Sequence, residues 1–131
     1  MAIQLAVSTR NVRLDAIETD LGADPDLEIF TGAQPANCAA ADSGTKLVSM
    51  QLPADAFAAA ASGAKGKTGT WSGTGITGGT AAHFRIKTAG GVVKVQGSVG
   101  QGSGDLSLDN TVIATSQAVT VTAFDLNDAN G

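Results

Sequence analysis

The order of apolar and polar positions divides the chain into a short helical stretch and a longer β-rich part. The apolar residues of the first stretch recur at helical spacing and therefore share one face: Leu14, Ile17 and Leu21. Ser8 or Thr9 can serve as the N-cap, because a side-chain oxygen there accepts an otherwise orphan backbone N–H. Gly22 suits the left-handed position that follows a helix. The pattern predicts a helix over residues 8–22, with residues 1–7 as an extended N-terminal arm.

After residue 22 the period of the pattern changes to two, which is typical of β-strands. The strands that we expect cover residues 27–31, 46–52, 67–72, 80–87, 92–99, 106–108 and 117–126, with one or two helical turns over 55–61. Turn signals separate them about every 8–12 residues, a spacing typical of sandwiches and barrels. We therefore predict a mainly β fold with one N-terminal α-helix. We expect residues 8–131, with the helix included, to form a single antiparallel β-sandwich domain, either jelly-roll-like or a partly closed barrel.

Small side chains dominate the composition and leave few bulky residues for a core. Ala (23), Gly (17), Thr (14) and Ser (9) make up 63 of the 131 residues, and only five residues are aromatic. The core must then be mainly aliphatic, and each Val, Leu or Ile contributes only about 1.5–3 kcal/mol when fully buried. We expect association with copies of this chain or with another protein to add a share of the stability.

Charge, hydropathy and cysteine content exclude several classes of protein. The net charge is −4 and the eight cationic side chains are scattered, so the sequence shows no basic stripe for direct nucleic-acid binding. No apolar run approaches the ~20 residues of a membrane span. No basic residue precedes the short apolar stretch at the N-terminus, so we predict no signal peptide. The single cysteine, Cys38, excludes an intramolecular disulfide and a multi-cysteine zinc site.

Paired carboxylates are the residues most suited to acid–base chemistry in this sequence. The candidate pairs are Asp105 with Asp109 and Asp125 with Asp128. Asp105, Asp109 and Asn110 also offer oxygen ligands for calcium, although the EF-hand spacing is absent. At strand ends, however, Asp commonly bonds the backbone of its own turn. We therefore expect that this protein is not an enzyme and that it binds no metal ion and no cofactor.

Three further features have both a functional and a structural interpretation. The one histidine, His83, alternates with the apolar face of its strand and is expected to face solvent. The glycines of residues 97–104 could cradle a phosphate, but a strand follows them where nucleotide motifs have a helix, so a flexible hairpin is favoured. Residues 65–67 (Lys-Gly-Lys) together with Trp71 could stack a base or a sugar ring. A core or interface position is the more common use of a tryptophan.

Six segments carry a resemblance to a known family. They are STRNVRLDAI at 8–17, LEIFTG at 27–32 (with Pro35 after it), GTAAHFRI at 79–86, VQGSVG at 95–100, DLSLDNT at 105–111 and VTVTAF at 119–124. Together they resemble a family of small, mostly uncharacterised proteins encoded among the structural genes of tailed bacteriophages and prophages. The resemblance covers nearly the whole chain except residues 65–78. It implies a structural role in the virion and supplies no catalytic motif.

This resemblance leads to two expectations for function. The first is a capsid decoration or minor capsid protein that binds the outer face of the major capsid protein as a symmetric oligomer, such as a trimer, and stabilises the shell. The acidic charge favours an outer position over one against packaged DNA. The alternative is a tail-associated or fibre module that binds a virion partner or a host glycan. Both place the protein in the virion, assembled in the host cytoplasm.

The residues expected to bind a partner are apolar or aromatic and lie in two places. Ile3, Leu5 and Val7 alternate along the N-terminal arm. An extended arm of this kind can add a strand to the sheet edge of a neighbouring protein. Trp71 lies in a Gly-rich stretch that we expect to be a surface loop. The sequence therefore predicts a binding surface formed by the arm and by the loop around Trp71.

Overall fold

The computed structural model describes residues 3–128, so residues 1–2 of the expected arm and residues 129–131 of the expected domain lie outside the described part. The described elements are α1 (Val7–Leu21), β1 (Asp26–Phe30), β2 (Lys46–Gln51), β3 (Ala64–Gly66), β4 (Ser72–Thr74), β5 (Gly79–Thr80), β6 (His83–Lys87), β7 (Val93–Gly100), β8 (Leu106–Leu108), β9 (Val112–Ile113) and β10 (Ala118–Asn127). The expectation of a mainly β fold with one N-terminal helix is confirmed.

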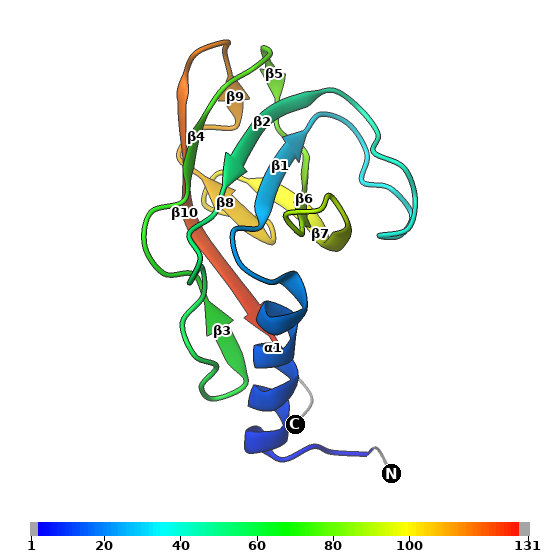
Figure 1. Ribbon diagram of the computed structural model, residues 1–131. Helices are drawn as coiled ribbons and strands as arrows, with labels where there is room; N and C mark the ends of the chain where they lie inside the picture. Colours follow the sequence, from blue (N-terminus) through cyan, green and yellow to red (C-terminus); the bar gives the residue numbers. More distant parts are fainter. Residues whose placement is uncertain (1–2, 129–131) are drawn as a thin grey trace.

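Eight of these strands form one curled sheet (Figure 1), and we call this sheet, apart from β3 and the end of β10, the barrel. Its order is β2-β1-β6-β7-β8-β10-β3, and β4 also pairs with β10. Beyond β4, Gly75 forms a single bridge with Val48 of β2, and the Ile76 N–H donates to the Leu47 carbonyl at 2.7 Å. The curl thus brings β2 against the segment that follows β4 at this one point, while the rest of the sheet stays open as a half-barrel. The strands β5 and β9 form a separate two-stranded sheet at the end of the molecule that is uppermost in Figure 1.

The sheet is mixed, so the purely antiparallel arrangement that the sequence pattern predicts is wrong. The end of β7 runs parallel to the start of β8, although only residues 101–105 connect them. Parallel neighbours normally need a crossover of a dozen or more residues. Here a Gly-rich loop doubles back instead. A Cβ at Gly100 would lie 2.5 Å from the Ser103 carbonyl oxygen, and Gly104 has a φ of +81°, which side chains disfavour. The antiparallel hairpin expected over residues 97–104 is therefore wrong.

The barrel interior is apolar, and four of the five aromatic rings cluster in it. Trp71 is fully buried, and its ring meets Phe57 edge-on with centroids 5.3 Å apart. Phe124 lies 5.6 Å from Trp71 and 5.5 Å from Phe84. Such aromatic pairs are worth about 0.5–1.5 kcal/mol each beyond the area that they bury. A few bulky residues therefore anchor a core that is otherwise aliphatic.

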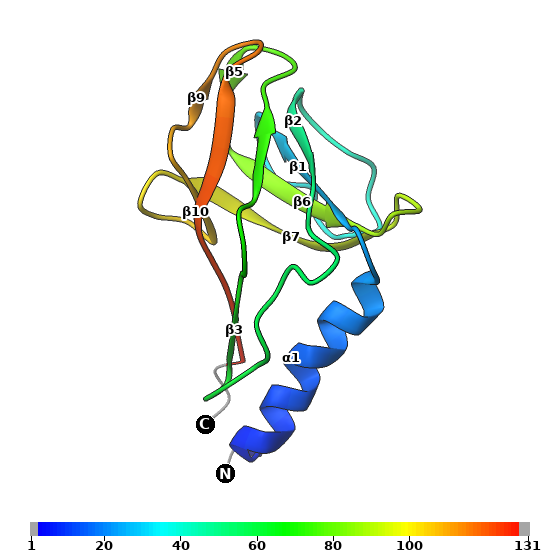
Figure 2. The ribbon, with the colours of Figure 1, turned by 60° about the vertical axis from the view of Figure 1, so that its left-hand side comes forward.

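Helix α1 projects away from the barrel beside β3 and the end of β10 (Figure 2). We call these three elements the stalk. The strands β3 and β10 pair there from Gly66 opposite Asp125 to Ala64 opposite Asn127. Leu21, at the end of the helix nearest the barrel, joins the main core. The rest of the helix extends beyond that core and needs other contacts to hold it.

The ends of the helix test two sequence predictions. The helix begins at Val7, with Ala6 as the N-cap and no side-chain cap, so the expected cap at Ser8 or Thr9 is wrong. Gly22 ends the helix with a φ of +77°, and its N–H donates to the Glu18 carbonyl at 3.1 Å, as the left-handed position predicted. Val7 therefore belongs to the helix and not to the arm.

The Gly-rich middle of the chain differs most from expectation. Residues 55–61 do not form helical turns; instead, Phe57 bridges Lys67 and sends its ring into the core. The single strand expected over 67–72 is replaced by β3 and β4, which lie on either side of an irregular stretch. Within that stretch Gly69 has a φ of +66°, which is incompatible with a continuous strand.

Candidate functional site

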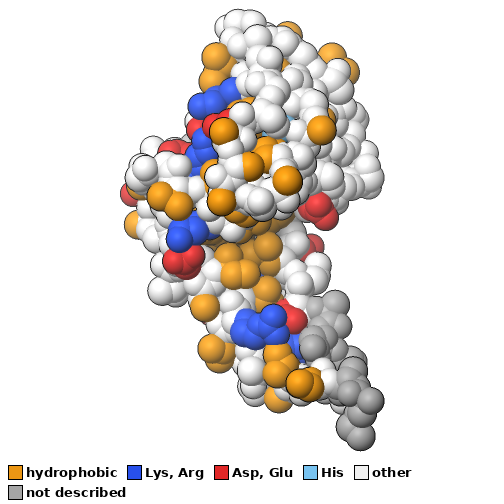
Figure 3. Space-filling model, turned by 90° about the vertical axis from the view of Figure 1, so that its right-hand side faces the viewer, with side chains coloured by type: hydrophobic (Ala, Val, Ile, Leu, Met, Phe, Trp, Pro, Cys, Tyr) orange, Lys and Arg blue, Asp and Glu red, His pale blue; other side chains and the backbone are white. Residues whose placement is uncertain are grey.

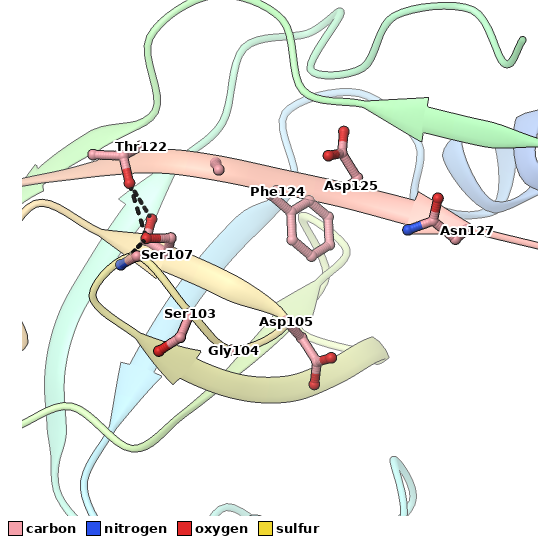
Figure 4. Close-up of a pocket in the computed structure, with 10 residues that line it drawn as sticks. Ser103, Gly104, Asp105, Ser107, Thr122, Phe124, Asp125 and Asn127 are labelled. Atoms are coloured by element: carbon pink, nitrogen blue, oxygen red, sulfur yellow. Dashed lines mark hydrogen bonds between the residues drawn. The ribbon is translucent and has the colours of Figure 1, made fainter.

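A surface hollow of about 450 Å³ lies between the β7–β8 loop and β10 (Figure 4). Its lining is mostly polar: Gly102, Ser103, Gly104, Asp105, Ser107, Thr122, Ala123, Phe124, Asp125 and Asn127. The Ser107 hydroxyl accepts a bond from the Gly102 N–H at 2.7 Å, and the Thr122 hydroxyl donates to the same oxygen at 3.1 Å. These bonds hold the loop against β10, so the hydroxyls are used within the protein.

The two carboxylates of this hollow do not converge on one point. In Figure 4 those of Asp105 and Asp125 point away from each other, with the ring of Phe124 between them. The Asp105 carboxylate accepts bonds from the backbone N–H and the hydroxyl of Ser98, at 2.9 and 3.0 Å. The hollow therefore lacks the facing acid and base that bond cleavage between them would require.

The other expected carboxylate partners are also engaged elsewhere. Asp109 accepts the Thr120 N–H at 3.2 Å, from strand β10 and not from its own turn as expected. Asp128 forms an ion pair with Arg13 at 3.2 Å. Within residues 3–128, no group of three or more His, Cys, Asp or Glu side chains is placed to hold a metal ion. The calcium site considered for Asp105, Asp109 and Asn110 therefore has no assembled carboxylate group in the described structure.

His83 is buried, which corrects the expectation that it faces solvent. Its side chain is 1 % exposed, and its ring stacks on Phe30 with centroids 5.2 Å apart. Its Nδ1 lies 2.9 Å from the Gly32 carbonyl oxygen, so Nδ1 carries the hydrogen and donates. The opposite face of β6 is therefore covered too, by the segment that follows β1.

This covering segment, residues 31–45, is called the strap, and Arg85 is its anchor. The Arg85 side chain is 1 % exposed and donates to carbonyl oxygens of the strap, those of Asn37, Cys38 and Ala40, at 2.9–3.2 Å. It also binds the Asp42 carboxylate at 2.6 Å and the Gln96 amide oxygen at 3.2 Å. One guanidinium thus satisfies three backbone carbonyls at once, as its five donors allow.

Lys87 extends this network along the same strand. Its ammonium lies 2.8 Å from Asp42 and 2.6 Å from Glu28. Hydrogen bonding from Lys87, ahead of that from Arg85, holds the pKa of Asp42 below its usual range. Burial acts to lower the pKa of Lys87, but hydrogen bonds to Asp42 and Glu28 outweigh it and raise that pKa. The network is therefore ionised and structural at neutral pH.

The basic and aromatic pairing expected at Lys65 and Trp71 does not form a surface site. Trp71 is 0 % exposed, so the expectation that it binds a partner from a surface loop is wrong. Lys65 is 1 % exposed and belongs to the stalk, where its ammonium binds Asp15 at 2.7 Å, Glu18 at 2.9 Å and the Ala58 carbonyl at 2.8 Å. Both residues are used to hold the fold together.

The ion pairs of Lys65 shift the pKa values of its group in the expected directions. A hydrogen bond from Lys65, followed by one from the Ala60 N–H, lowers the pKa of Asp15. Burial acts to lower the pKa of Lys65, yet the bonds to Asp15 and Glu18 leave it raised. These shifts favour the charged forms of both groups and describe a stable tie between α1 and β3.

The exposed apolar side chains remain as candidates for binding. Of the expected arm, Ile3 is 83 % exposed, Val7 is 46 % exposed on the first turn of α1, and Leu5 is half-buried. Ile76 and Val112 are exposed at the opposite end of the molecule, near the β5–β9 pair. Val12 on α1 and Val92 before β7 are exposed as well, so the described surface offers apolar groups at both ends and between them. Those of the arm agree with the sequence prediction in being accessible.

Sequence reasoning missed the buried roles of His83, Arg85 and Lys65. The one signal available was that His83, Arg85 and Lys87 share a strand face, an unusual density of polar side chains that a covering loop could satisfy. Among residues 3–128, no helix is both long and apolar enough to cross a membrane. No protein-family model matches this chain, and comparison with curated proteins and with solved structures finds no match.

Proposed function

We propose that this protein is a structural component of a tailed-bacteriophage virion, acting as a capsid decoration or minor capsid protein on the outer shell. The sequence resemblance given above motivates this proposal. The observation that carries it is the placement of exposed apolar side chains, Ile3 and Val7, at the end of the stalk away from the barrel (Figure 2). Such a stalk end can attach to a shell while the barrel projects outward.

Two further observations support a structural role. Except for Asp125, the acidic, histidine and lysine side chains considered for chemistry have partners within the protein, from Asp105 on Ser98 to Lys65 on Asp15. All five aromatic residues are at most 4 % exposed, so none offers a flat surface for stacking a sugar ring. The tail or fibre alternative relied on an exposed Trp71, and it now lacks that support.

The attachment is tested by replacing the arm residues and measuring shell binding. Ile3→Asp with Val7→Asp should abolish co-sedimentation with shells assembled without this protein. The fold should survive, because Asp in the first turn of a helix is favourable. Ile76→Asp with Val112→Asp makes the matched change at the opposite end and should leave binding intact. Equal binding by both double variants would refute attachment through the arm.

The location is tested by labelling the protein and imaging whole virions. Asp128 pairs with Arg13 of the stalk, so a label at the C-terminus would lie close to the proposed attachment surface. A short tag inserted after Thr115, in the exposed turn between β9 and β10, avoids this. Label spread over the head supports the proposal, whereas label confined to the tail would refute it and favour the alternative.

A further inference from the structure

One side of α1 carries four residues at the surface of the stalk, three of them exposed and one, Ile17, half-buried against the core. Arg13, Ala16, Ile17 and Asp20 follow the spacing i, i+3, i+4, i+7, so they form one stripe along the helix. Figure 3 shows this side of the molecule, where apolar side chains gather below the barrel between charged side chains of both signs. We call the four residues the α1 face.

The two ends of the α1 face carry opposite outward charges. At the end away from the barrel, Arg13 is 56 % exposed and covers its ion-pair partner Asp128, which is 11 % exposed. At the end near the barrel, Asp20 is 63 % exposed over Lys94, which is 31 % exposed. Each ion pair therefore turns one charge outward, positive at one end and negative at the other.

The centre of the α1 face is apolar and uneven. Ala16 lines two adjoining hollows of about 540 and 480 Å³, one on each side of it. Ile17 lies next to Ala16 and is half-buried, because it packs against the barrel core. Val95 and Leu126 are half-buried against that core as well. The small side chain of Ala16 thus leaves a depression in the middle of the face, beside the half-buried Ile17.

We propose that a second copy of this chain docks on the α1 face, with the two helices antiparallel about a two-fold axis. Positions 13 and 20 are equidistant from the midpoint between positions 16 and 17. An axis through that midpoint sets Arg13 against Asp20 of the second copy, and Ala16 against Ile17. The same axis repeats both contacts, as an isologous interface requires. The exposed charges are thus self-complementary in this one orientation, and the apolar centres of the two faces meet.

This two-fold contact differs from the trimer expected from the sequence, and it does not depend on the proposed place in the virion. Arg13 and Asp20, the charged rim of the α1 face, are well hydrated, and a single pair of helices buries little area. We therefore expect a weak dimer, with a Kd of about 10 µM to 1 mM. Its affinity should fall as salt is raised, because the rim charges are exposed.

Charge reversal with mixing tests the proposal in solution. Sedimentation equilibrium should show that Arg13→Asp and Asp20→Arg each weaken self-association by about tenfold or more, because each sets like charges against each other in both symmetric contacts. An equimolar mixture of the two variants should form a heterodimer, since every rim contact then joins opposite charges. The double variant should dimerise like the wild type. The ion pairs of Arg13 with Asp128 and of Asp20 with Lys94 stay broken in it, so intramolecular effects do not explain this recovery.

The controls separate this contact from general effects of charge and from the proposed function. Asp55→Arg makes the same charge change as Asp20→Arg at an exposed position on another element, and it should leave the dimer unchanged. Circular dichroism checks that each variant folds. A wild-type chain that stays monomeric at about 1 mM, a trimer, or variants that fail to heterodimerise would each overturn the proposal. Shell binding, measured separately, does not enter this result.

Discussion

The barrel and the stalk are held together by different forces, although one chain runs through both several times. In the barrel, apolar side chains of six strands, β1, β2, β6, β7, β8 and β10, meet in one core around Trp71. In the stalk, α1 contributes Leu21 to that core and packs Ile17 against it, and the rest of the helix is fixed largely by polar contacts from Asn11, Asp15 and Glu18 to the segment around β3. The two regions therefore differ in what a single substitution can break.

This difference implies a difference in cooperativity. Removing a core side chain weakens every strand that it touches, so the whole barrel should unfold as one unit. Removing a polar contact of the stalk exposes charged groups that water can solvate, so α1 should open locally while the barrel persists. Substitutions in each region, followed by both calorimetry and hydrogen exchange, can separate the two outcomes.

The largest effect is expected for Trp71→Ala in the barrel. Truncating a fully buried tryptophan removes the contacts with Phe57 and Phe124 and leaves a cavity, at a cost of about 3–5 kcal/mol. Calorimetry should show a lower Tm in a single transition. Val112→Ala, at a residue that is 62 % exposed, should change stability by less than about 0.5 kcal/mol. A small effect at Trp71 would mean that the aromatic cluster is not what holds the barrel together.

Arg85→Met should be the most damaging change to a polar residue. It keeps the aliphatic part of the side chain but leaves the strap carbonyls and Asp42 without their buried donor, at a cost of about 3–5 kcal/mol. Hydrogen exchange should show faster exchange across residues 31–45 before the strands open.

The control for Arg85 is the more exposed ion pair of Lys46 with Glu28. Lys46→Met should cost only about 0–1 kcal/mol, because an exposed ammonium gains little from its partner. If the strap of the Arg85 variant stays as protected as that of the wild type, then Arg85 is not its anchor, and the covered face of β6 needs another explanation.

The strands could be predicted from the sequence wherever apolar and polar positions alternate along them. The alternation around β1, β2, β6 and β10 gave their positions to within a few residues. Alternation does not reveal whether a loop covers the second face of a strand. The sequence pattern predicts that the face of β6 with His83 and Arg85 is exposed, because nothing in the pattern indicates that the strap covers it.

The stalk was the less predictable region for a physical reason. Its contacts join residues far apart in the chain, such as Lys65 with Asp15, and a lysine carries no local sign of burial. The Gly-rich stretch that contains β3 and β4 also lacks the apolar alternation on which strand prediction depends. Of the residues expected to bind a partner, the sequence placed Ile3 and Val7 correctly as accessible but misplaced Trp71.

A moderate and local effect is expected for Lys65→Met in the stalk. The buried ammonium loses its bonds to Asp15, Glu18 and the Ala58 carbonyl, which costs about 1–3 kcal/mol. The partly exposed carboxylates can turn to water, so the loss should be smaller than at Arg85. Amides of α1 should exchange faster while those of β6 keep their protection.

Lys67→Met is the control for this change, because Lys67 lies only two residues away in the sequence. Its ammonium lies at the surface and donates to the Gly69 carbonyl. It should leave the exchange of α1 unchanged. Should Lys65→Met instead accelerate exchange across the barrel as much as across α1, the stalk and barrel would form a single cooperative unit, and the comparison drawn above would fail.

The smallest effect is expected on lowering the pH, and it should be felt in both regions. The pKa of Asp42 in the strap and that of Asp15 in the stalk are lowered from 3.8 by their lysine partners. A carboxyl whose pKa is lower in the folded state adds stability above the unfolded value, and this is lost as pH falls through the folded one. The thermal stability, measured as Tm, should therefore fall below about pH 4. Asp42→Asn should flatten this dependence and open the strap, whereas Asp55→Asn, at an exposed turn, should leave it unchanged. If Asp42→Asn shows the same dependence of stability on pH as the wild type, then the strap is held by the bonds from Arg85 to its carbonyl oxygens alone.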